Sequence, residues 1–138
     1  HCGVCSNCFL RRFSAFNAGL SPIHGEHEYL WNNLCVGELS AALDGRSANR
    51  GTTDNDKKIA LGGVLSHSHL AQFAYEIDTD GNSSFSQSVY ELSRALSVDR
   101  QFASERVRRL LLAHSKEWNA FLEALPTGSW VKNYAGGA

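Results

Sequence analysis

The chain has 138 residues, 43% hydrophobic and 20% charged, which is typical of one soluble globular domain. Its net charge of −1 argues against a nucleic-acid partner, because domains that bind nucleic acids are usually strongly basic. No stretch reaches the roughly 18 apolar residues of a membrane-spanning helix, and no signal peptide opens the chain. We therefore expect a cytoplasmic protein without membrane contact. Since the chain starts at His1 rather than methionine, we also expect it to be the C-terminal part of a longer protein.

The apolar residues of the first half predict short helices followed by one long helix. Phe9, Phe13 and Phe16 lie on one helical face, and Gly19 is placed to end that helix. Weak helical pieces are expected over 29–34 and 38–43. A long helix is expected from Thr53, a plausible N-cap, to about Ile77. Its apolar pattern changes phase near 66–69, which predicts a kink or a break there.

The second half predicts two more helices and a loose end. One helix carries the stripe that includes Phe85 and Val89, and the next starts after Asp99 and runs to Pro126. Residues 129–138 are expected to form a loose tail. No alternating strand pattern is present, so the predicted fold is all-α. Nine residues are expected to share one core: Phe85, Val89, Leu92, Leu96, Leu110, Leu111, Trp118, Phe121 and Leu122.

Three of the four cysteines, Cys2, Cys5 and Cys8, lie three residues apart at the start of the chain. A tight turn with this spacing brings three thiols within reach of one ion, and Gly3 supplies the backbone freedom that such a turn needs. Structural zinc takes four sulfur or nitrogen ligands, so one more is required. The candidates are a cysteine upstream of the chain, His1, Cys35 or a distant histidine.

Disulfides, an iron–sulfur cluster and ordinary buried thiols each fit the cysteine pattern less well than zinc does. Disulfides need an oxidising compartment, and the pattern lacks the further cysteine and proline of bacterial ferredoxins. Ordinary buried thiols would not account for three cysteines in seven residues. We therefore predict a zinc knuckle formed by Cys2, Cys5 and Cys8, followed by a small helical bundle.

The segment Cys2-Gly3-x-Cys5-x-x-Cys8-x-x-Arg11-x-x-x-x-Phe16-x-Ala18-Gly19-Leu20 resembles the C-terminal zinc motif of 7-cyano-7-deazaguanine synthases. That family belongs to the PP-loop ATP pyrophosphatase superfamily, has an α/β core, and makes the nitrile precursor of queuosine from 7-carboxy-7-deazaguanine, ammonia and ATP. The resemblance implies a four-cysteine zinc site whose first cysteine lies upstream of this chain. It also implies an upstream PP-loop domain that binds ATP.

The resemblance covers residues 1–22, and the sequence continues well beyond the end of an ordinary synthase. The family's Ser-Gly-Gly-x-Asp-Ser phosphate loop has no counterpart here. The long helical extension is similar to that of synthase-like proteins from anti-phage systems. On this interpretation residues 1–22 are the zinc motif, 23–51 are a linker with short helices, and 52–138 are a helical C-terminal module.

Two functions follow from this interpretation. The chain is either the inactive C-terminal piece of an ATP-dependent, ligase-like enzyme acting on a deazaguanine-type acid, or a non-enzymatic helical module that docks a partner subunit. Arg11 and Arg12 are either contacts to the substrate or ATP phosphates of the upstream domain, or the solvated side of a short helix. The arginines at 106, 108 and 109 are interpreted as a solvated helix face, because no aromatic residues interleave with them.

The remaining polar motifs are interpreted as structural. Residues 78–89 resemble a calcium loop, but Val89 stands where a bidentate glutamate is needed, so a turn between helices is predicted. His67 and His69 point to different helix faces and are expected to be solvated or hydrogen-bonded. His24 and His27 could share a helix face, but as a metal site they would need further ligands.

Overall fold

A computed structural model of the chain describes residues 2–20, 29–44, 51–80 and 83–136. Over these ranges the protein is mostly helical and has no β-strand, which confirms the predicted all-α fold. None of the described helices combines the length and the apolar character needed to span a bilayer. His24 and His27, and the centre of the calcium-like turn at 81–82, lie outside the described residues.

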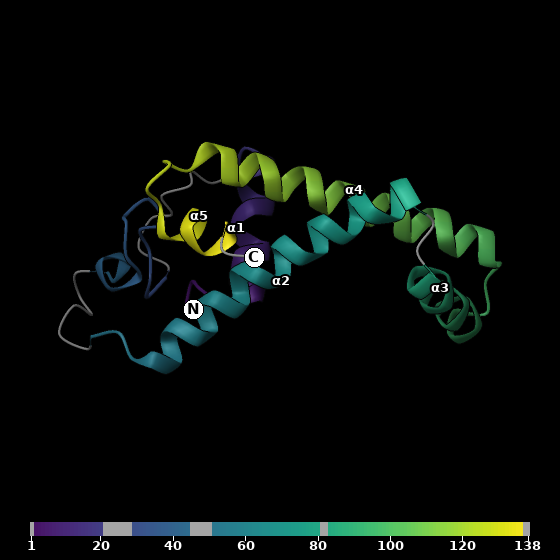
Figure 1. Ribbon diagram of the computed structural model, residues 1–138, viewed down its shortest axis with the longest axis horizontal. Helices are drawn as coiled ribbons and strands as arrows, with labels where there is room; N and C mark the ends of the chain where they lie inside the picture. Colours follow the sequence, from purple (N-terminus) through teal and green to yellow (C-terminus); the bar gives the residue numbers. More distant parts are fainter. Residues whose placement is uncertain (1, 21–28, 45–50, 81–82, 137–138) are drawn as a thin grey trace.

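Two long antiparallel helices form the frame of the molecule. In Figure 1 these two helices, α2 and α4, pack against each other along the longest axis of the molecule. Helices α1 and α5 lie against one half of the pair, and α3 lies at the opposite end. The elements, in chain order, are α1 (Ser6–Asn17), the 3₁₀ helix η1 (Leu39–Ala42), α2 (Asp54–Asp80), α3 (Ser83–Leu96), α4 (Arg100–Ala124) and α5 (Trp130–Ala135).

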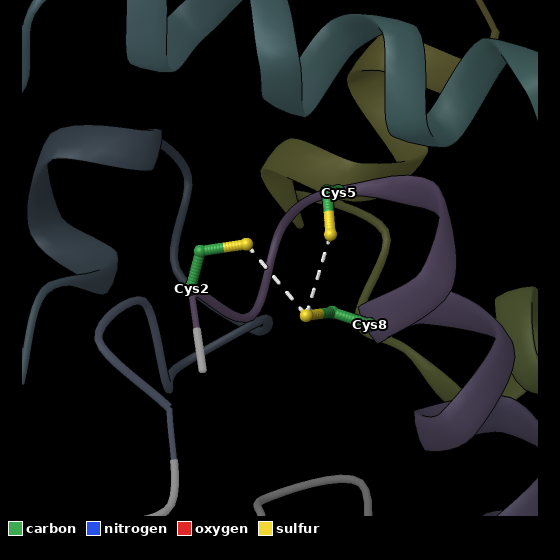
Figure 2. Close-up of side chains that lie close together, drawn as sticks. All are labelled: Cys2, Cys5 and Cys8. Carbon is green, nitrogen blue, oxygen red and sulfur yellow. Dashed lines mark hydrogen bonds between the residues drawn. The ribbon is translucent and has the colours of Figure 1, made fainter.

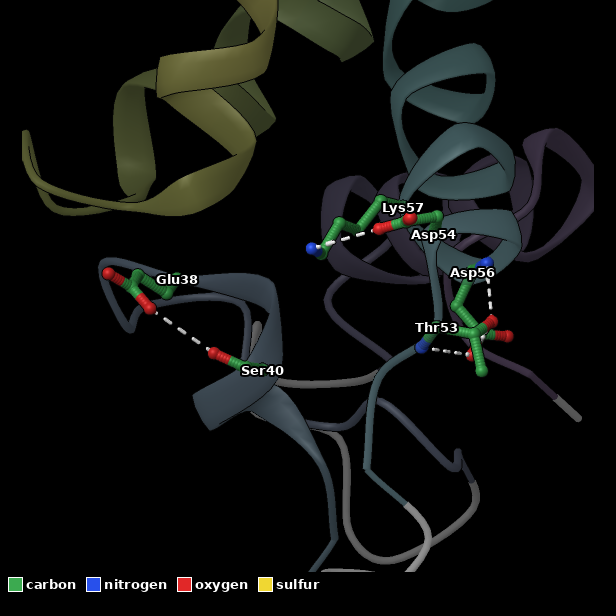
Figure 3. Close-up of polar contacts among 6 residues, drawn as sticks. All are labelled: Glu38, Ser40, Thr53, Asp54, Asp56 and Lys57. Atoms are coloured by element: carbon green, nitrogen blue, oxygen red, sulfur yellow. Dashed lines mark hydrogen bonds and ion pairs between the residues drawn. The ribbon is translucent and has the colours of Figure 1, made fainter.

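Helix ends follow the predicted signals. Gly19 adopts a positive φ of 68° after α1, and the amides of Gly19 and Leu20 donate to the carbonyls of Phe16 and Ala15. This is a Schellman motif, which satisfies carbonyls at the end of the helix. At the start of α2, Thr53 and Asp56 cap each other: the Asp56 amide donates to the Thr53 hydroxyl over 3.2 Å, and the Thr53 amide donates to the Asp56 carboxylate over 2.9 Å (Figure 3).

The buried side chains form two clusters rather than the single core that was predicted. The proximal cluster joins α1, α5 and the adjoining halves of α2 and α4, and its largest buried members are Trp31, Trp118, Trp130, Phe9, Phe13 and Phe121. Among the described residues, the distal cluster contains Ile77, Phe85, Val89 and Ala103, with Phe73, Val107 and Leu111 packed against it. Leu92, Leu96 and Leu110 are exposed, because the apolar stripes of α3 and α4 are wider than the faces their neighbours cover.

The predicted break in the long helix is absent, since α2 runs without interruption. The change of phase near 66–69 marks a change of neighbours instead. Ala60, Val64 and Ala71 belong to the proximal cluster, whereas Ile77 belongs to the distal cluster. Because α2 packs into two clusters with different neighbours, its apolar residues lie on a different face in each half, and the sequence shows this as a change of phase.

The predictions for the C-terminal residues and for residues 29–34 were wrong. Residues 129–136 are not loose, because Trp130 and Val131 of α5 are fully buried and Ser129 caps this helix. No helix forms over residues 29–34. That segment is extended instead, with one bridge between Trp31 and Leu43, while the 3₁₀ helix η1 fulfils the expectation of a short helical piece over 38–43.

Candidate metal centre

The three N-terminal thiols converge on one point. The Sγ atom of Cys8 lies 3.4 Å from that of Cys5 and 3.6 Å from that of Cys2, and all three sulfurs lie within 4.8 Å of one another (Figure 2). Cys5 is the N-cap of α1, Cys8 lies in its first turn, and Cys2 reaches them from the preceding turn. None of the four cysteines forms a disulfide. The donor set and its spacing fit a thiophilic metal ion such as zinc.

The turn that carries Cys2 is held by the extended segment 29–31. The amide of Trp31 donates to the Cys2 carbonyl over 3.0 Å. Gly3 has a φ of 95°, and a Cβ at this position would lie only 2.6 Å from the Trp31 carbonyl oxygen and 2.8 Å from the Tyr29 Cβ. Only glycine therefore permits this close approach without strain.

Helix α2 closes the turn from the other side. A Cβ on Gly63 would lie 2.3 Å from the Val4 carbonyl oxygen and 3.2 Å from the ring of Phe9. Val4 itself is almost fully buried. The backbone of α2 therefore rests directly on the backbone between Cys2 and Cys5, which fixes the relative position of the two thiols.

Arg12, one turn after Cys8, is buried, and its guanidinium contacts the segment 29–32. Its guanidinium donates to the carbonyls of Trp31 and Asn32 over 2.7 and 3.1 Å and stacks 4.0 Å from the centre of the Tyr29 ring. Burial lowers the pKa of Arg12 to about 10, while the nearby phenol and thiols oppose that shift, so the group stays charged at neutral pH. Arg11 is exposed on the opposite side of α1. Contact of either arginine with a phosphate stays a prediction.

The thiols differ in how readily they ionise. Burial opposes ionisation of Cys2, but hydrogen bonds from the Val4 and Cys5 amides and from neighbouring thiols outweigh it and lower the pKa of Cys2 to about 7. Burial and the adjacent thiols raise the pKa of Cys8 to about 11. A bound cation would reverse this penalty, because metal ligation favours the thiolate form.

No fourth side chain of the described residues joins this group of thiols. Among the described histidines, cysteines and carboxylates, only Cys2, Cys5 and Cys8 come together as a possible metal-binding group. Cys35 packs against the proximal cluster but lies outside this group, and His1 lies outside the described residues. A ligand from an upstream segment remains the prediction of the family resemblance.

Two histidines that spacing alone did not connect lie beside the knuckle. The rings of His67 in α2 and His114 in α4 stack with their centres 5.2 Å apart. The Nδ1 atom of His67 lies 2.9 Å from the Nε2 atom of His114. The Nε2 atom of His67 lies 2.8 Å from the Ser6 carbonyl oxygen, so it carries a proton and donates to it. The expectation that His67 is hydrogen-bonded is confirmed. Its partner, 47 residues away, could only be found from the pairing of α2 with α4.

Comparison with known proteins gives no family, curated protein or solved structure that matches this chain. The class of site therefore rests on the geometry of the three cysteines.

Proposed function

We propose that Cys2, Cys5 and Cys8 hold a structural zinc ion. The separations of the three sulfurs carry this proposal. With Zn–S bonds of about 2.3 Å, a tetrahedral site places its sulfurs about 3.8 Å apart. The two shortest separations, 3.4 and 3.6 Å, lie close to that value, so little movement is needed to bind the ion.

The role of the ion is to fasten the N-terminal turn to α1. Sites made of cysteine thiolates are closed structural sites in most zinc proteins, whereas catalytic zinc keeps a position for water. The thiolates bring an excess of negative charge into a partly buried place, and the buried guanidinium of Arg12 offsets part of it. Arg12 also holds the segment 29–32, so it joins the ligand turn to the proximal cluster.

We further propose that the chain is the zinc-binding and helical part of a cytoplasmic protein resembling 7-cyano-7-deazaguanine synthase. The support is the match of Cys2, Cys5 and Cys8, with Arg11 and the Phe16 to Leu20 segment, to the family motif. ATP-dependent ligation on a deazaguanine-type acid would then be carried out by an upstream PP-loop domain. In that assembly zinc would stiffen the turn beside the base pocket, and Arg11 faces solvent where it could reach a phosphate.

Metal titration tests the zinc proposal. The 138-residue chain, prepared without metal, should bind about one zinc and, with cobalt, develop thiolate-to-metal absorption. Binding should be weakened at least about tenfold by Cys8→Ser and unchanged by Cys35→Ser. Absence of metal binding would contradict the proposal, whereas an equal loss in both variants would make Cys35 the fourth ligand. Pyrophosphate release from ATP should stay at the level of a no-enzyme control.

A further inference from the structure

The end of the molecule farthest from the knuckle exposes a group of apolar side chains. This end is the turn between α3 and α4, seen at the extreme of the long axis in Figure 1. Tyr90 is 43% exposed, Leu96 61% and Phe102 49%, with Leu92 and Val98 also accessible. The distal cluster beneath them is small, so these side chains add little to folding and remain available for contact.

Arginines surround the exposed rings. The guanidinium carbons of Arg94 and Arg100 each lie 5.8 Å from the centre of the Tyr90 ring, one contributed by α3 and the other by α4. Arg106 lies 5.1 Å from the centre of the Phe102 ring. The Tyr90–Arg94 and Phe102–Arg106 pairs are four residues apart within one helix, and the α3–α4 turn adds Arg100 to the Tyr90 ring. We call Tyr90, Arg94, Leu96, Arg100, Phe102 and Arg106 the distal surface.

The arginines of the distal surface form no ion pair with the carboxylates whose side chains the structure describes. The neighbouring carboxylates each accept a hydrogen bond from an uncharged donor: Glu91 from Gln87, Glu105 from Gln101, and Asp99 from the Phe102 amide. The three arginines of the distal surface place positive charge there, although the whole chain carries −1.

The position of Arg100 is unfavourable for the fold itself. It is the first residue of α4, where the positive end of the helix dipole disfavours a cation. Asp99, as the N-cap, relieves only part of this repulsion. The Arg100 guanidinium also donates to the Ser86 carbonyl of α3 over 3.4 Å, so this residue helps to join α4 to α3 as well as facing outward.

We propose that the distal surface binds an acidic, amphipathic segment of a partner protein, with carboxylates paired to Arg94, Arg100 and Arg106 and apolar side chains packed on Tyr90, Leu96 and Phe102. The exposed aliphatic groups distinguish a protein from a single-stranded nucleic acid, because Leu96 and Val98 offer no ring for a base to stack on. Burial of aromatic and arginine side chains is also what concentrates binding energy in protein interfaces. This surface is independent of the proposed zinc site.

Selection from a random peptide library tests the proposal. The zinc-loaded chain should enrich peptides that combine Asp or Glu with Leu or Phe, and fluorescence anisotropy should then measure the affinity of the best peptide. The double variant Arg94→Glu/Arg100→Glu should weaken binding at least about tenfold. A charge-matched control, Lys58→Glu/Lys116→Glu, alters exposed lysines away from this surface and should change binding less than about twofold. Equal melting temperatures would show that both variants are folded.

Several results would overturn the proposal. These are no enrichment of acidic peptides, an equal loss of binding in the two double variants, or binding of a single-stranded oligodeoxythymidine that depends on Arg94 and Arg100. Sedimentation showing a dimer that dissociates in Arg94→Glu/Arg100→Glu would also overturn it, because the occupant would then be a second copy of this chain.

Discussion

Gly63 lies where the backbone of α2 touches the backbone of the cysteine turn, and its Cα hydrogen is part of that contact. The Gly63→Ala variant would place a Cβ 2.3 Å from the Val4 carbonyl oxygen, an approach that only displacement of the turn can relieve. We expect a loss of about 1–3 kcal/mol in the free energy of unfolding, or more, and weaker zinc binding. Urea denaturation and zinc titration measure the two effects.

Gly62 provides the matched control, because it occupies the same helix and a Cβ added there would meet no atom within 4 Å. Alanine is the better helix former by up to about 1 kcal/mol, so Gly62→Ala should leave stability unchanged or raise it. A loss of equal size in both variants would mean that helix propensity, and not contact with the turn, governs this region.

Arg12 is the second residue whose role depends on contacts to backbone atoms. Arg12→Met would leave the Trp31 and Asn32 carbonyls without their charged donor, at a cost of about 2–3 kcal/mol. Zinc affinity should fall as well, because the segment that holds Cys2 loosens and a compensating charge is lost. Arg11→Met, on the exposed side of α1, should cost less than about 1 kcal/mol. Similar costs for the two variants in urea melts would refute this role of Arg12.

At the scale of the helices, the His67–His114 pair makes the packing of α2 on α4 sensitive to pH. Burial lowers the pKa of His67 below its ordinary value of 6.5, and burial together with the charge of His67 lowers the pKa of His114. Below about pH 6.5 the unfolded chain therefore binds more protons than the folded chain. The free energy of unfolding should decrease as the pH falls below that value.

Urea melts at about pH 7.5 and about pH 5.5, in excess zinc, measure this effect. The loss of stability between the two pH values should be smaller in the double variant His67→Gln/His114→Gln, because neither amide titrates. The rest of the chain, including the thiols, is common to both proteins and cancels in the comparison. An identical pH dependence in both would exclude the histidine pair as its source.

The helices themselves were largely predictable from the sequence, whereas their partners were not. Gly19, Thr53 and Asp99 mark helix ends by local hydrogen bonding, so their signals appear in the sequence. Burial of Trp130 depends on residues about 95 positions earlier, since its amide donates to Val36 and the Ser129 hydroxyl donates to Leu34. No short-range pattern reports such contacts, which is why this end was expected to be loose.

The same limit applies to the candidate site. The spacing of Cys2, Cys5 and Cys8 is local, and it predicted their convergence. The contacts of Gly63 with Val4, and of Arg12 with Trp31, join segments that are distant in sequence. The helical periodicity of the phenylalanines places Arg12 on the opposite, more polar side of α1. It could not show that the segment 29–32 covers Arg12 there.

At the scale of the whole molecule, the two clusters divide the long α2–α4 pair into ends of unequal stability. The proximal cluster contains three buried tryptophans and surrounds the knuckle, whereas the distal cluster has four buried members among the residues whose side chains are described, one of them an alanine. Because burial of apolar surface is the main source of stability, the distal end should open at a lower free energy than the proximal end. Such local opening would leave the cysteine turn in place.

Trp118→Ala and Val89→Ala separate the two ends. Trp118 is fully buried against Phe9, Phe13 and Phe121, so its loss should cost about 3–5 kcal/mol, a large share of the roughly 5–15 kcal/mol typical of a domain. Hydrogen exchange should then accelerate in every helix. Val89→Ala should cost about 2 kcal/mol and accelerate exchange only in α3 and the first half of α4, with zinc affinity unchanged. If Val89→Ala accelerated exchange in α1 as strongly as in α3, the molecule would unfold as one cooperative unit, and the distal surface would be as firmly held as the metal centre.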